Sequence, residues 1–189
     1  MTARTRLIGS AIALLQRKGV AGTGIAQLLE HSGIARRSVY LNFPGGKAEL
    51  ITDAAASAGK VISNAIRSLA AESDPVAAVQ EFVALWKDAL VGSDFEAGCP
   101  IVAAALGRSE APGAADVAGE VFTDWEHLFA ARLEGAGVAA ETALRLATTT
   151  IAAVEGALIM SLAVRSVAPL QRAGQMVAEL IAHHTGRPS

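Results

Sequence analysis

The stretch RRSVYLNFPGGKAEL, residues 36–50, contains most of the features that decide the fold of this chain. Its first seven residues have the pattern of a short helix, which Pro44, Gly45 and Gly46 then break. Lys47 begins a second pattern, in which apolar residues recur with helical spacing. A short helix, a tight turn and a long helix are therefore predicted in succession.

A second short helix is predicted just before this stretch, from about Gly24 to His31, with Thr23 as its N-cap. Gly33 is the turn residue between the two helices, because glycine tolerates a positive φ. Two such helices have the lengths and the turn of a helix-turn-helix unit. That unit places its second helix in the major groove of DNA, with the first residues of the helix reaching base edges.

Arg36 and Arg37 occupy those first positions, where an arginine fork matches the O6/N7 edge of guanine and discriminates by about 1–3 kcal/mol. Lys47 lies in the first turn of the next helix, which is a poor place for a cation unless it serves an anion such as a phosphate. The alternative is a helical hairpin with solvated arginines, and Ser38 and Asn42 contact either DNA or water. The predicted DNA-contacting residues are Thr23, Arg36, Arg37, Ser38, Tyr40, Asn42 and Lys47.

The charge of the chain is divided unevenly. Residues 1–60 carry eight basic and three acidic side chains, a net charge of +5, whereas residues 61–189 carry eight basic and fifteen acidic ones, a net charge of −7. Such a division points to a polyanionic partner on one side only. Ordinary surface charge explains it equally well when charge is considered alone.

Helical periodicity continues through the whole chain, so the expected fold is all-α with about nine helices. Asp74 and Pro75 open one helix as its cap and its first residue. Residues 92–98 and 109–115 are predicted loops, and Ala139–Ser166 is the longest predicted helix. The other predicted helices are Ala3–Lys18, Gly24–His31, Arg36–Asn42, Lys47–Ala71, Pro75–Gly92, Pro100–Gly107, Ala115–Gly135 and one opened by Pro169.

Cysteine content and hydropathy both favour a cytoplasmic protein. The single cysteine, Cys99, excludes an intrachain disulfide and fits a reducing compartment. Residues 146–164 are apolar over the length of a membrane span, but Glu155 lies near their middle, where an acid costs about 2.5–3.5 kcal/mol on insertion. A buried helix of a soluble protein is therefore predicted, with no membrane partner.

The segment GTGIAQLLEHSGIARRSVYLNFPGGKAEL resembles the DNA-binding domain of the TetR family of bacterial transcriptional regulators. The family's Tyr-x-x-Phe and Lys-x-x-Leu patterns are present as Tyr40, Phe43, Lys47 and Leu50. The extra residue in Pro-Gly-Gly-Lys resembles the subgroup typified by the LmrA and YxaF regulators, as do the downstream segments GCPIV (98–102) and EGALIMS (155–161). The chain departs from the family at two positions, Arg37 and Gly24, where smaller and hydroxyl-bearing residues respectively are common.

The resemblance implies a helix-turn-helix domain over residues 1–48 and a ligand-binding and dimerisation domain over residues 49–189. It also implies a homodimer formed through the last two helices of each subunit. Small residues that recur from Thr142 to Ser166 favour close helix packing independently of the family. The alternative for this segment is an internal core helix.

The ligand pocket is expected where the few aromatic residues share helix faces, because small-molecule sites are mostly apolar with few polar groups. Glu155 either accepts a hydrogen bond from an effector or pairs with a buried arginine, Arg132 or Arg145. Plain core packing is the alternative for the aromatic residues. The predicted ligand-binding residues are Phe82, Trp86, Cys99, Phe122, Trp125, Phe129, Glu155 and Ile159.

These features favour a ligand-responsive DNA-binding transcriptional regulator, a homodimeric repressor released from its DNA operator by a small hydrophobic or aromatic effector. An activator role remains open. The alternatives are a hydrophobic small-molecule binding protein without a regulatory DNA role, or an enzyme using Cys99, although no GxSxG, P-loop or metal-binding motif is present. No cofactor and no metal are expected, because His183 and His184 lie at a helix end with no further ligands nearby in sequence.

Overall fold

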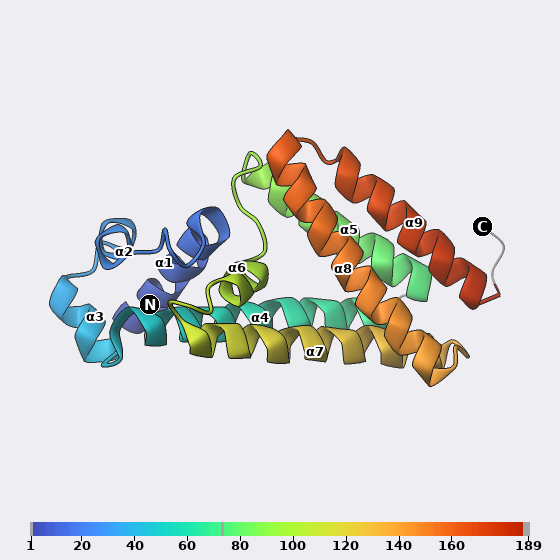
Figure 1. Ribbon diagram of the computed structural model, residues 1–189, viewed down its shortest axis with the longest axis horizontal. Coiled ribbons are helices and arrows are strands. Elements are labelled where there is room, and N and C mark those ends of the chain that lie inside the picture. Colours follow the sequence, from blue (N-terminus) through green and yellow to red (C-terminus); the bar gives the residue numbers. More distant parts are fainter. Residues whose placement is uncertain (1, 73, 187–189) are drawn as a thin grey trace. The chain divides into compact units, whose positions relative to one another are not determined.

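The computed structural model describes residues 2–72 and 74–186, and within these ranges it contains nine helices and no strand (Figure 1). The prediction of an all-α fold is confirmed. The helices are α1 (Ala3–Lys18), α2 (Ile25–Ser32), α3 (Arg36–Asn42), α4 (Gly46–Glu72), α5 (Pro75–Gly92), α6 (Pro100–Leu106), α7 (Pro112–Gly135), α8 (Ala140–Val164) and α9 (Ala168–His184).

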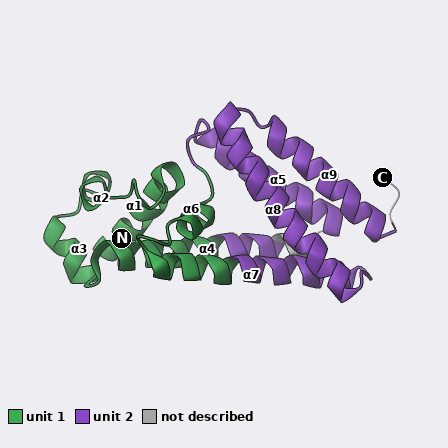
Figure 2. Ribbon diagram, viewed as in Figure 1, with its two compact units in different colours: residues 1–61, 98–121 green, residues 62–97, 122–189 purple. Residues whose placement is uncertain are grey.

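The chain divides into two compact units, which Figure 2 shows in different colours. Unit 1 comprises residues 1–61 and 98–121, and therefore contains α1, α2, α3 and α6 together with the beginnings of α4 and α7. Unit 2 comprises residues 62–97 and 122–189. The units are not the two predicted domains, because α6 clusters with the N-terminal helices; a functional boundary after residue 48 stays a prediction.

Helix α1 is the centre of unit 1, because α2, α3 and α6 all pack against it. Its buried face carries Leu7, Ala11 and Leu14, spaced three and four residues apart as an amphipathic helix requires. Two contacts fasten the segment around α6 to this core. The N–H of Gly98 donates to the carbonyl of Gln16 at 2.9 Å, and Gly107 lies so close to Val20 that a Cβ there clashes with the valine side chain.

Unit 2 is built on α9, which packs against both α5 and α8. Helix α9 approaches α5 closely at Gly174, where a Cβ lies only 2.6 Å from a methyl group of Val83. Arg165, in the left-handed conformation with φ 50°, ends α8. The turn that follows is closed by the N–H of Leu170, which donates to the Ser161 hydroxyl at 3.3 Å.

Two predicted boundaries are wrong. Helix α7 begins at Pro112, inside the predicted loop 109–115, because proline is tolerated in the first turn of a helix, where its missing N–H has no intrahelical partner. The longest helix is α4 with 27 residues, whereas α8 has 25 and ends at Val164.

Helix α8 is the one helix within the described ranges that is long and apolar enough to cross a membrane by length and composition. In its most apolar 18-residue window, 44% of the residues are buried. A core helix of a soluble protein passes the same test, so a single helix of this kind is weak evidence for a membrane span.

The predicted cap of α5 supplies a test of stability. The Asp74 carboxylate accepts hydrogen bonds from the N–H groups of Val76 and Ala77 at 2.9 and 3.2 Å. Asp74→Ala removes this cap, so we expect a loss of about 0.5–2 kcal/mol in the free energy of unfolding. Asp74→Asn, which keeps a capping oxygen, is the control and should lose much less in urea denaturation. Equal losses in both variants contradict the capping role.

Candidate nucleic-acid interface

The turn between α2 and α3 is held in place by hydrogen bonds to α2 and to α1. Gly33 adopts the left-handed conformation with φ 64°, and its N–H donates to Leu29. The Arg6 guanidinium of α1 donates to the Ser32 carbonyl at 2.6 Å, and the Ser32 hydroxyl accepts from the N–H of Ile34 at 3.2 Å. A helix-turn-helix unit is therefore formed by residues 25–42 and held against α1.

Helix α3 turns one face to the core and the opposite face to solvent. Val39 is fully buried, while Arg36 and Arg37 are exposed. Arg37 and Leu41 each lie two residues from Val39, which is about 200° around the helix, so they form its outermost ridge. Among the described residues neither arginine forms an ion pair. Two unpaired cations therefore stand on the exposed face of this helix.

Leu41 was missed among the candidate contacts, although its side chain is 69% exposed beside Arg37. An apolar side chain on a groove-facing helix can contact the methyl group of thymine, whereas an arginine fork suits guanine. The spacing of Leu41 from the buried Val39 was the available signal.

The other residues of α3 that were predicted to contact DNA differ in how free their side chains are to bind it. Tyr40 is half-exposed, and its ring lies beside Gly46, where a Cβ is 3.7 Å from the ring. Asn42 donates from its amide to the Ser38 carbonyl at 2.7 Å, so part of its hydrogen-bonding capacity is used within the helix. Phe43 is fully buried, and the guanidinium of Arg4 lies over its ring, 5.0 Å from the ring centroid.

Thr23 requires a correction. The residue that caps α2 is Gly24, and it provides no side-chain hydrogen bond. Thr23 is fully buried, and its hydroxyl donates to the Gly19 carbonyl at 2.7 Å. Its only O–H is thus used inside the protein, and a phosphate, which needs a donor, finds none here. The capping prediction is wrong, and we do not retain Thr23 as a DNA contact.

The start of α4 is occupied by carboxylates. Lys47 donates from its ammonium group to Glu110 at 2.8 Å, and the N–H of Gly45 donates to Glu49 at 2.7 Å. Glu110 was not anticipated as the partner of Lys47, because it is 63 residues away in sequence. Lys47, which was expected to attract a phosphate, and the neighbouring N–H of Gly45 are therefore both engaged by carboxylates of the chain itself.

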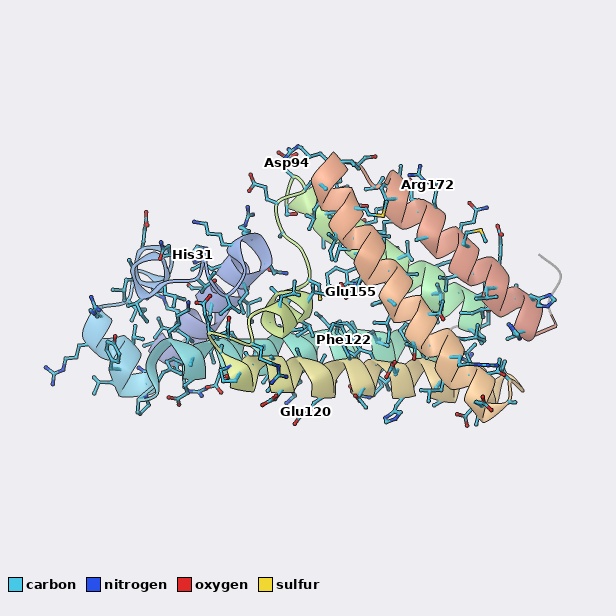
Figure 3. All side chains as sticks on the ribbon, viewed as in Figure 1. His31, Asp94, Glu120, Phe122, Glu155 and Arg172 are labelled. Carbon is cyan, nitrogen blue, oxygen red and sulfur yellow. The ribbon has the colours of Figure 1, made fainter. Side chains whose placement is uncertain are left out.

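In unit 2, four of the predicted ligand-binding residues form one buried aromatic cluster. Phe82 is at its centre, with edge-to-face contacts to Trp86, Trp125 and Phe129 at centroid distances of 6.3, 6.4 and 5.4 Å. Phe122, which is half-buried, contacts Trp125 at 5.4 Å and is labelled on α7 in Figure 3. Such contacts stabilise a core whether or not a ligand is present.

The two tryptophans of this cluster differ in their N–H groups. Trp125 donates to the Ser63 hydroxyl at 3.0 Å in the buried interior. The indole N–H of Trp86 is buried and has no hydrogen-bond partner within the described residues. Burying an N–H donor without an acceptor is unfavourable in free energy. Of the residues in this cluster, Trp86 is therefore the one that gains most from a ligand with a hydrogen-bond acceptor.

Glu155 lies buried on α8, with 6% of its surface exposed (Figure 3). Arg145, one of its two predicted partners, is exposed and lies 4.0 Å from Glu141 instead, so that alternative is wrong. Arg132 lines a small pocket with Asp74 and Thr185. Cys99 is buried in unit 1, immediately before α6, whereas the aromatic cluster belongs to unit 2.

Ile159 is a second correction among the ligand-binding candidates. Its side chain is 52% exposed, because α8 turns Val154, Glu155 and Leu158 inward and leaves Ile159 and Met160 on its outer face. It does not line the interior of this chain. A groove of about 540 Å³ does occur between α5 and α9, but none of the predicted ligand-binding residues lines it.

Comparisons with known proteins agree with this geometry. Residues 7–54 match the family described as bacterial regulatory proteins of the tetR family, and residues 75–176 match the C-terminal domain described as transcriptional regulator LmrA/YxaF-like. The HTH-type transcriptional regulator YxaF of Bacillus subtilis is 31% identical over 183 residues, which cover 94% of each chain. An HTH-type transcriptional regulator of Mycobacterium tuberculosis is 30% identical over 185 residues, covering 94% of this chain and 93% of that protein.

Solved structures show the same fold at low sequence identity. The crystal structure of regulatory protein TetR from Rhodobacter sphaeroides superposes with a TM-score of 0.86 at 17% identity, covering 94% of this chain and 97% of that one. A TetR transcriptional regulator from Legionella pneumophila gives 0.85 at 19% identity, covering 95% and 97%. The chain therefore belongs to the TetR family of DNA-binding bacterial transcriptional regulators, with a C-terminal region of the LmrA/YxaF-like type.

Proposed function

We propose that this regulator is a homodimeric repressor of the cytoplasm, released from its operator by a small hydrophobic or aromatic effector. The observation that carries the DNA-binding part is the outer face of α3. There Arg37 and Leu41 form the outermost ridge, Arg36 lies beside them, and the Arg6–Ser32 contact fixes the turn before them. Arginine for guanine and leucine for thymine give this ridge the means to read a mixed sequence in the major groove.

Dimerisation is supported by apolar side chains that no part of the described chain covers on α8 and α9. Along α8 the exposed residues recur at helical spacing and form a stripe, and on α9 Met176 and Leu180 are exposed one turn apart. Several small residues predicted to serve this face, including Ala143 and Ser161, are instead buried within the chain. The stripe consists of Ala152, Gly156, Ile159, Met160 and Ala163.

The effector proposal is supported by the aromatic cluster around Phe82 and by the unsatisfied Trp86 N–H. An effector that offers a hydrogen-bond acceptor to Trp86 and an apolar ring to its neighbours satisfies both features. The regulator is then released from DNA if the effector binds best to a shape in which the two α3 helices of the dimer are not about 34–36 Å apart, the length of one turn of DNA. An enzyme that uses Cys99 has no comparable support, since the matched curated relatives are described as regulators.

The DNA-binding proposal is tested with duplexes selected from a random pool by the wild-type protein. Arg36→Ala/Arg37→Ala should lower affinity at least ten-fold, because a bidentate arginine–guanine contact is worth about 1–3 kcal/mol. If both arginines also neutralise phosphates, the slope of log affinity against log salt should fall by about 2. Fluorescence anisotropy at several salt concentrations measures both.

Lys87→Ala, which removes an exposed cation from α5, is the control and should leave binding unchanged. Selection of no duplex by the wild-type protein defeats the repressor proposal and favours a ligand carrier without a DNA role. Wild-type binding by the double arginine variant defeats the assignment of these contacts.

The dimer proposal is tested by Ile159→Glu, which places a carboxylate in the middle of the α8 stripe. We expect the sedimentation coefficient to fall to that of a monomer at micromolar concentration, and operator affinity to fall with it. Leu106→Glu, at a more exposed leucine on α6, is the matched control and should remain dimeric. A monomeric wild type, or a dimeric Ile159→Glu variant, contradicts this face as the interface.

The effector proposal is tested by a thermal-shift screen of aromatic compounds that carry a hydrogen-bond acceptor. A compound that raises the melting temperature should also release the operator, and Trp86→Phe should weaken its binding about 2–10-fold, the value of one hydrogen bond. Lys87→Gln, on the next and exposed residue of α5, is the control. Unchanged binding by Trp86→Phe removes Trp86 from the pocket.

A further inference from the structure

The contact between Lys47 and Glu110 has a consequence for DNA binding that neither residue suggests alone. Lys47 stands at the start of α4, only four residues after Phe43, the C-cap of α3, and on the proposed DNA surface it meets a phosphate. In the structure its ammonium group lies 2.8 Å from a carboxylate oxygen of Glu110. A carboxylate and a phosphate offer the same chemistry to an ammonium ion, which is an anionic oxygen acceptor. An ammonium group that donates to Glu110 has fewer N–H groups and less uncompensated charge to offer a phosphate.

Glu110 is presented from a well-ordered turn between α6 and α7. The Gly107 carbonyl accepts from the N–H groups of Glu110 and Ala111, both at 3.0 Å. The Ala111 side chain is buried, and Gly107 packs directly against Val20. The position of Glu110 therefore depends on how the segment around α6 sits on the rest of unit 1.

A second carboxylate acts at the same helix start. Glu49 accepts from the N–H of Gly45, just before α4, and so occupies a donor that an incoming phosphate also seeks. Glu49 belongs to α4 itself and moves with it, whereas Glu110 comes from a segment 63 residues later. Of the two anions, Glu110 is the one whose distance from α4 a rearrangement can change.

We infer that Glu110 is an internal mimic of an operator phosphate: it holds Lys47 in the DNA-free protein and competes with DNA for it. The inference rests on the proposed DNA-binding role of α3 and α4. Helix α7, which begins two residues after Glu110, continues along the chain into unit 2.

The size of the expected effect on DNA affinity follows from the solvent exposure of the two side chains. The side chains of Lys47 and Glu110 are 25% and 42% exposed, so the pair is a partly solvated ion pair rather than a buried one. Pairs of this kind contribute a factor of about 1.4–5 to an equilibrium constant. Glu110 is thus a modulator of operator affinity that a modest rearrangement can overcome.

The test is a double-mutant cycle on a duplex selected by the wild-type protein. Glu110→Gln should bind about 1.4–5-fold tighter than the wild type, because Lys47 is freed for phosphate. In the Lys47→Gln background the same Glu110 substitution should change affinity much less. Asp116→Asn is the control: it removes one negative charge of the same unit, but its carboxylate pairs with Arg108 at 2.8 Å and not with Lys47.

Each outcome decides one question. Equal affinity of Glu110→Gln and wild type overturns the inference while leaving the repressor proposal intact. An equal gain from Glu110→Gln with and without Lys47, or from Asp116→Asn, also overturns it, because the effect is then general charge repulsion. If the wild-type protein selects no duplex, the failure lies with the proposed DNA-binding role, and Glu110 has no phosphate to compete with.

Discussion

The hydrogen bond from Arg6 to the Ser32 carbonyl is the contact on which the DNA-binding surface depends. A helix-turn-helix unit of 18 residues, from Ile25 to Asn42, is too small to form a core by itself, so its two helices take their orientation from α1. Arg6 anchors the turn, and Leu28 and Val39 are buried in the same core. The basic residues of α3 are therefore presented by a rigid scaffold, although α3 has no side-chain cap of its own.

Much of this architecture could be predicted from local sequence, because its signals act within one turn of a helix. Asp74 followed by Pro75 fixes the start of α5, and Gly33 fixes the turn between α2 and α3. Phe43 is buried as its spacing requires. These features depend on backbone conformation and on apolar periodicity, both of which are readable over a few residues.

The features that sequence could not supply depend on distant partners. Threonine is a common N-cap residue, but the Thr23 hydroxyl donates to the carbonyl of Gly19, four residues earlier. Glu110 gives no local indication that it faces Lys47, because the two residues are 63 positions apart in sequence. Ile159 was assigned to the interior, but α8 is apolar on most sides, and such a pattern does not say which apolar residues face the core of the chain and which stay exposed.

The order of small and large side chains along the exposed stripe of α8 also bears on how such regulators coexist in one cell. Ala152 and Gly156 are small exposed residues of the stripe, whereas Ile159 and Met160 are large exposed ones. If two copies pair through this stripe, each large side chain needs a hollow opposite it. A paralogue with another order of sizes meets it with voids or overlaps, both of which cost stability. Under that condition the stripe favours pairing of identical subunits over mixing with subunits of related regulators.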